Sequence, residues 1–159
     1  MIDGGADMSK VEQRIKELGY VLPECPVPVA AYVPVKKFGN FIFASGQTAQ
    51  SNGKPVYIGK VGQEISLEEA RKSAELCALR LISVLKTVTD LDKVHILKVT
   101  GFVNAVPDYK NHPQVVDGAS VLLESVFLEK GHHARSAIGM GSLPGQASVE
   151  VELIAAVEE

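Results

Sequence analysis

Apolar side chains recur at helical spacing in three segments of the chain. Residues 8–20 predict a short leading helix. Residues 66–90 open with a serine and a glutamate three positions apart, the spacing of a capping box, ahead of a long apolar stripe. Residues 114–131 repeat an apolar stripe of the same period and predict a second amphipathic helix.

Other segments carry the patterns of β-strands. Residues 31–47 hold two runs rich in strand-forming side chains, joined at residues 37–40, and predict a hairpin. Residues 93–105 predict a further strand, and residues 132–159 predict a closing hairpin that turns at Pro144 and Gly145. The proline-rich residues 21–30 exclude a helix and favour an extended connector.

The order of these elements predicts the α+β fold class, with a mostly antiparallel sheet and the two longer helices on one side. We expect residues 1–30 to form an N-terminal segment with a short helix and a proline-rich connector, and residues 31–159 to form one domain. The face of the sheet that the helices leave open then needs other cover.

The predicted closing hairpin carries charges where a buried strand would have none. Alternation places Glu150 and Glu152 on one face of the last strand. If the turn is tight, Arg135 lies opposite Ile154 and shares the face of the glutamates, with Glu152 the nearer of the two. Two interpretations stay open: a structural ion pair of Arg135 with Glu152, or a functional cluster in which a longer loop, a bulge or a neighbouring subunit joins Arg135 to Glu150.

Composition narrows the function classes. The formal net charge of −3 and the absence of a Lys/Arg run argue against a nucleic-acid partner. Two cysteines, Cys25 and Cys77, argue against a disulfide scaffold and favour the cytoplasm. No run of apolar residues approaches the length of a membrane span, so no membrane partner is expected. His132 and His133 are adjacent and would point to opposite faces of a strand, so we expect no metal site there.

Several motifs taken together resemble one known family. The combination "AYVPV", "GNFIFASGQ", "GFVNA", "ARSAIG" and "LPGQASVEVELIA" is similar to the YjgF/RidA family, also called the L-PSP endoribonuclease family. The resemblance runs from about Ala31 to Ala156, and the leading helix is similar to that of a branch whose members are mostly uncharacterised. It implies a chorismate-mutase-like fold and a homotrimer whose sheets face inward, with active sites in clefts between subunits.

The resemblance also assigns roles to residues of the closing segment. It implies that Arg135 holds the carboxylate of a substrate, a task that suits the planar fork of a guanidinium. It implies that Glu150, rather than Glu152, handles the attacking water. The further residues that it places at the substrate are Tyr32, Ser45, Gly46, Ala137 and Asp117. Ala137 stands where deaminases of the family carry cysteine; substrate preference should shift if the thiol shapes the pocket, and should change little if only the backbone contacts the ligand.

These residues suit the hydrolysis of a 2-imino or enamino acid to a 2-keto acid and ammonia. The imine carbon is already electrophilic, so orientation and a proton shuttle suffice and no cofactor or metal is implied. An alternative is a non-catalytic protein that binds a small carboxylate metabolite. A third possibility, endoribonuclease activity, rests on the family's older name alone, and the acidic charge argues against it.

Overall fold

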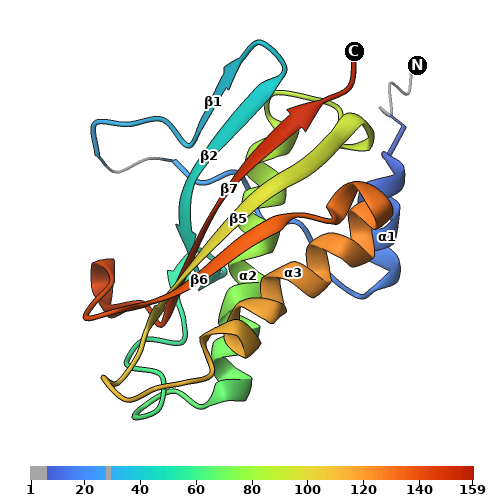
Figure 1. Ribbon diagram of the computed structural model, residues 1–159. Coiled ribbons are helices and arrows are strands. Elements are labelled where there is room, and N and C mark those ends of the chain that lie inside the picture. Colours follow the sequence, from blue (N-terminus) through green and yellow to red (C-terminus); the bar gives the residue numbers. More distant parts are fainter. Residues whose placement is uncertain (1–6, 28–29) are drawn as a thin grey trace.

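The computed structural model describes residues 7–27 and 30–159 and shows a five-stranded sheet with helices on one side (Figure 1). The strands run in the order β1-β2-β7-β5-β6. Their bounds are Val35–Phe38 for β1, Phe41–Thr48 for β2, Val149–Val157 for β7, Val94–Asn104 for β5 and Ala134–Met140 for β6. A separate small hairpin consists of β3 (Gln50–Ser51) and β4 (Lys54–Pro55). The predicted α+β class is confirmed, and the sheet is mixed because β5 and β6 are parallel.

Three helices form where the apolar periodicity predicts them: α1 at Lys10–Glu17, α2 at Leu67–Lys86 and α3 at His112–Phe127. Short 3₁₀ turns at Leu91–Lys93, Leu128–Gly131 and Pro144–Gln146 complete the structure. The capping box of α2 is present in both directions, because the Ser66 side chain accepts from Glu69 N and the Glu69 side chain accepts from Ser66 N. No helix in the described part of the chain is long and apolar enough to cross a membrane.

The leading helix α1 packs on the outside of its own chain, beside α3 (Figure 1). Val11 and Ile15 are buried, and Asp92 accepts hydrogen bonds from the first backbone N–H groups of the helix. Arg14 donates to the backbone oxygen of Val126 near the end of α3. These contacts fix α1 far from the open face of the sheet.

The prediction of a closing hairpin is wrong. The strands β6 and β7 are not paired, because β5 lies between them, parallel to β6 and antiparallel to β7. Residues 141–148 cross the end of β5, where buried Asn104 bonds to the backbone oxygens of Ala147 and Ser148. The strand β7 takes a central position because its alternate side chains are apolar and buried, whereas β6 is a shorter strand with more exposed side chains, which suits an edge.

The register divides the residues of the sheet between two faces. Val99 on β5 lies between Arg135 on β6 and Leu153 on β7, so these three side chains share the face that the helices cover. The opposite face carries Glu150 beside Phe102. Apolar side chains are also exposed on that open face, among them Phe41 at 50% and Phe43 at 47%. The sheet therefore has one closed and one open face, and the open one is not conventionally polar.

Candidate active site

Arg135 lies on the edge strand β6, on the helix-covered side of the sheet, and its guanidinium contacts helix α3. Its Nη1 donates to Asp117 Oδ1 at 2.7 Å and to Ser120 Oγ at 3.2 Å, and its Nη2 donates to the backbone oxygen of Pro113 at 3.3 Å. Of its five N–H donors, the Nε–H and one N–H of Nη2 have no partner among the described residues. The guanidinium is thus oriented and still has two donors for a ligand.

Glu150 lies on the central strand β7, on the open side of the sheet, between Thr48 of β2 and Phe102 of β5. Its side chain is half-buried. Burial raises the pKa of Glu150 above its ordinary value, and the negative charge of Glu152 raises it further. The carboxylate therefore holds its proton to a higher pH than an exposed glutamate does.

Gly46 lies against the Glu150 carboxylate at a bulge in β2. A Cβ at this position would overlap Glu150 Oε1 and would lie only 3.0 Å from its Cδ. A side chain at this position would push the carboxylate away, because the backbone of β2 approaches it closely.

A cavity of about 240 Å³ opens beside Glu150, and we call it the Glu150 cavity. It brings together three of the residues singled out in the sequence. These are Tyr32, Gly46 and Glu150. Its other walls come from Gln47, Thr48 and Gln50, from Arg80 on α2, and from Pro26, Val27, Pro34 and Pro144.

The other predicted site residues lie elsewhere. Ser45 Oγ donates to the backbone oxygen of Val33 at 2.7 Å and so fastens the segment that leads into β1. Asp117 faces Arg135 rather than Glu150. Ala137 lies on the helix-covered side of β6, two residues after Arg135, and packs against the core.

Arg135 and Glu150 are on opposite faces of the sheet, so a single chain does not join them. The expectation that Arg135 shares the face of Glu150 and Glu152 is therefore wrong. It depended on a direct pairing of β6 with β7, whereas insertion of β5 places Arg135 level with Leu153, a core residue. The interpretation as an ion pair with Glu152 fails for the same reason, and Arg135 pairs instead with Asp117.

The sequence matches, over residues 12–157, the family described as "YjgF/chorismate mutase-like, putative endoribonuclease". The chain belongs to this family. The resemblance to the YjgF/RidA family and its chorismate-mutase-like fold is thereby confirmed.

Similar proteins match nearly the whole chain. Protein TCP17 of Trypanosoma cruzi is 34% identical over 148 residues, which are 91% of this chain and 92% of TCP17. The crystal structure of Atu1372, a protein of unknown function from Agrobacterium tumefaciens, is 39% identical with a TM-score of 0.88 and covers 94% of this chain and 93% of its own. A "putative endoribonuclease" from Shewanella oneidensis MR-1 is 30% identical with a TM-score of 0.90 and covers 92% of this chain and 99% of its own.

One charged residue of the Glu150 cavity was not found from the sequence. Arg80 is a single arginine within the apolar run "CALRLISVL" of α2, between buried Leu79 and Leu81. Its guanidinium donates hydrogen bonds to Gln47 and Gln50, which line the Glu150 cavity with it. The available signal was a lone cation in an otherwise apolar stretch, because a charge in such a place needs a structural or functional reason.

Proposed function

We propose that this protein hydrolyses 2-imino or enamino acids to 2-keto acids and ammonia, in clefts between the subunits of a homotrimer in the cytoplasm. The observation that carries the proposal is the separation of Arg135 and Glu150. One offers two spare donors on the closed side of an edge strand, and the other is a half-buried carboxylate on the open face.

A symmetric assembly can bring together Arg135 and Glu150, which a single chain holds on opposite faces of the sheet. If the open face of one sheet packs near the edge strand of the next subunit, Arg135 of one chain approaches Glu150 of another. The exposed Phe41 and Phe43 on the open face favour such packing, since monomers rarely leave adjoining large apolar side chains in water. The family resemblance implies the same arrangement with three subunits.

Arg135 holds the carboxylate of the substrate in this proposal. The Nε–H and the remaining Nη2–H suit the two oxygens of a carboxylate. Asp117, Ser120 and the Pro113 oxygen hold the rest of the guanidinium, so little side-chain entropy is lost when the ligand binds. Asp117 acts here as a positioning residue for Arg135.

Glu150 acts as the general base and then as the acid. Its carboxylate takes a proton from water while the water oxygen bonds to the imine carbon and the C=N π electrons move to nitrogen, which takes up a proton. In the resulting carbinolamine the hydroxyl proton passes through Glu150 to the amino group as the C–N bond breaks and the C=O bond forms, so that ammonia leaves and the keto acid remains. The raised pKa of Glu150 suits both steps, because a group that titrates closer to the working pH can accept and return a proton.

The remaining predicted site residues contribute to the proposed reaction through the shape of the site. Tyr32 lines the Glu150 cavity and would contact the substrate, while Gly46 allows β2 to hold the carboxylate in place. Ser45 acts indirectly by fastening the segment before β1. Ala137 lies on the side of Arg135, so the absent thiol would alter the pocket around the substrate carboxylate and leave the water-activating group untouched.

A second candidate function is the binding of a small carboxylate metabolite without turnover. Asp117 already neutralises part of the charge of Arg135, and Ala137 replaces the family's cysteine, an arrangement that also suits a binding site. Both functions require Arg135, and only hydrolysis requires Glu150.

The test is to incubate the purified protein with 2-iminopropionate generated in situ and to follow keto-acid release. Wild type should release pyruvate faster than the buffer control, while Arg135→Gln and Glu150→Gln should match the buffer. The matched control is Lys72→Gln, which removes an exposed charge from α2. A wild-type rate equal to that of buffer contradicts the proposed hydrolysis. In that case, binding of keto acids that persists in Glu150→Gln favours the second candidate function, metabolite binding without turnover.

Subunit mixing tests the inter-subunit cleft. Coexpression of Arg135→Gln with Glu150→Gln should restore activity, because roughly a quarter of the clefts in all randomly assembled trimers combine the intact arginine of one chain with the intact glutamate of its neighbour. No restoration in mixed trimers of confirmed mass would place both residues in separate sites.

A further inference from the structure

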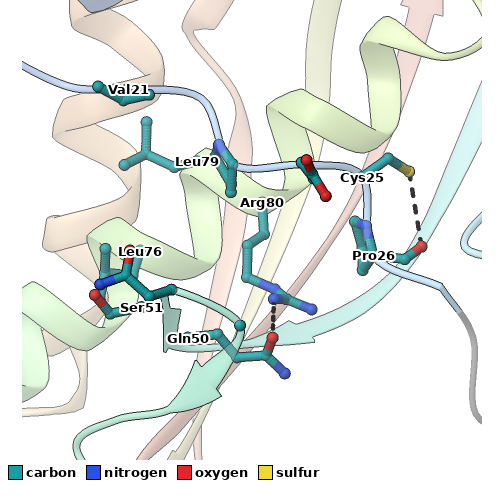
Figure 2. A pocket seen from close by; sticks show the side chains of 12 residues that line it. Val21, Cys25, Pro26, Gln50, Ser51, Leu76, Leu79 and Arg80 are labelled. Atoms are coloured by element: carbon teal, nitrogen blue, oxygen red, sulfur yellow. Dashed lines mark hydrogen bonds between the residues drawn. The ribbon is translucent and has the colours of Figure 1, made fainter.

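Arg80 lies where two cavities meet. The Glu150 cavity and a larger cavity of about 600 Å³ share Pro26, Gln50 and Arg80 in their walls. The larger one, which we call the connector cavity, lies between residues 21–26, α2 and the β3–β4 hairpin (Figure 2). The guanidinium of Arg80 points from α2 towards Gln50 at this junction. It is the cation that both cavities share.

The partners of Arg80 are neutral. Its Nε and Nη2 donate to Gln47 Oε1 at 3.2 and 3.1 Å, and its Nη1 donates to Gln50 Oε1. Among residues 7–27 and 30–159 no carboxylate lies within ion-pair distance of it; Glu24 and Glu150 line the cavities but form no salt bridge with it. The two amides therefore orient the guanidinium without cancelling its charge.

A half-buried cation without a counter-charge is costly. Burial lowers the pKa of Arg80 below its ordinary value, which reflects that cost. A structural arginine at such a place would be expected to pair with an acid, as Arg135 pairs with Asp117. Arg80 instead has capacity for an anion supplied from outside.

The remaining donors of Arg80 fit a carboxylate. Three of its five N–H groups are engaged, one each on Nε, Nη1 and Nη2, so that one N–H remains on each terminal nitrogen. Two such donors on one planar group match the two oxygens of a carboxylate. Glu150 lines the same cavity, so a ligand held by Arg80 extends towards the group that handles water in the proposed reaction.

We propose that Arg80 is a carboxylate-binding residue of the Glu150 cavity and that the protein prefers dicarboxylic ligands. The substrates are then 2-imino dicarboxylic acids. This assignment of the substrate class rests on the proposed function, whereas the carboxylate site at Arg80 does not. Arg135 of the neighbouring subunit binds the carboxylate next to the imine, and Arg80 binds the distal one.

The experiment measures the affinity of the full-length protein for two ligands of equal chain length. By calorimetry, 2-oxoglutarate should bind about tenfold or more tightly than 2-oxopentanoate, which lacks the distal carboxylate, since a charge-assisted pair is worth that much. Arg80→Gln should bring the ratio close to one, and Arg80→Lys should leave an intermediate ratio. Lys72→Gln, on the same helix, should keep the wild-type ratio.

Equal affinity of wild type for the two ligands overturns the inference and needs no variant for its interpretation. A preference that survives in both folded Arg80 variants, as judged by circular dichroism and thermal unfolding, overturns it as well. Glutarate and pentanoate separate the two proposals. If neither 2-oxo acid binds but glutarate binds and Arg80→Gln abolishes that binding, the Arg80 site stands and the proposed function fails. If 2-oxopentanoate is bound through Arg135 and a second carboxylate adds nothing, the function stands and the Arg80 site fails.

Discussion

The guanidinium of Arg135 and the carboxylate of Asp117 form an ion pair, with 2.7 Å between Nη1 and Oδ1. The pair joins the edge strand β6 to helix α3. It is partly exposed, with 22% of the Arg135 side chain and 42% of the Asp117 side chain accessible. The free energy of unfolding should therefore depend little on it, and its main effect should be on the direction in which Arg135 points.

Asp117→Ala should weaken the binding of 2-oxopentanoate about tenfold, because the guanidinium loses the partner that orients it. Asp117→Asn should restore most of the affinity, since the amide oxygen accepts the same hydrogen bond. Calorimetry checks both variants, and urea unfolding should show a loss of less than about 1 kcal/mol for Asp117→Asn. Equal affinities of wild type and Asp117→Ala would exclude a positioning role.

Gly46→Ala should abolish most of the activity while the protein still folds. The added methyl group overlaps Glu150 Oε1, and the carboxylate, which is the end of a flexible side chain, must turn away from its place. Gly141→Ala is the matched control, because its Cβ would meet no atom within 4 Å. Keto-acid release and the thermal midpoint should both be measured. Full activity of Gly46→Ala would show that the position of the Glu150 carboxylate is unimportant.

The rate of imine hydrolysis should fall on acidification, with a midpoint above the ordinary pKa of a glutamate. The proposed mechanism requires the basic form of Glu150, and burial together with the charge of Glu152 raises the pKa of Glu150. Glu152→Gln removes the repulsion and should move this limb of the pH–rate profile to lower pH. An unchanged limb in that variant would assign the midpoint to another group.

Glu150→Gln should increase the free energy of unfolding at pH 7. The folded state holds the Glu150 proton to a higher pH than the unfolded chain does, so stability falls as the pH rises from the unfolded pKa through the folded one. Below the unfolded pKa both states are protonated, and the advantage of the glutamine should vanish there. Urea unfolding at pH 4 and pH 7 measures the difference. A variant less stable than wild type at pH 7 would contradict this sign.

Phe43→Glu should dissociate the proposed homotrimer into monomers. The side chain lies on the open face of the sheet and is 47% exposed in the single chain. If subunits pack on this face, the introduced carboxylate would be buried without a partner, which is costly. Val121→Glu on the outer side of α3, where the exposed fraction is 54%, is the control and should keep the wild-type mass. Light scattering coupled to gel filtration gives both masses. A wild-type mass for Phe43→Glu would move the interface away from this face.

The helices and the first hairpin were predictable because their signals are local. The capping box at Ser66 and Glu69, and the apolar stripes of α2 and α3, involve residues within a few turns of one another. The turn between β1 and β2 is also local: Phe38 and Phe41 pair across two residues, and Gly39 supplies the positive φ of +58° that the turn needs.

The partner of each strand was not predictable in this way. The chain around Pro144 and Gly145 has the composition of a tight turn, yet it forms a crossover from the edge to the centre of the sheet. Only the difference in burial between β6 and β7 separates the two outcomes, and burial depends on the whole fold. Arg80 was missed for a related reason, because its role comes from two cavities that distant segments enclose.

The sequence by itself determined the helices, the α+β class, the family and the identity of Arg135, Glu150, Tyr32 and Gly46 as residues of interest, since these follow from short-range patterns and from motifs. The tertiary structure alone decided which face of the sheet each side chain occupies. Insertion of β5 between β6 and β7 sends Arg135 to one side and Glu150 to the other. The physical reason is that strand pairing is a long-range choice, made by the burial of apolar side chains from the whole chain at once.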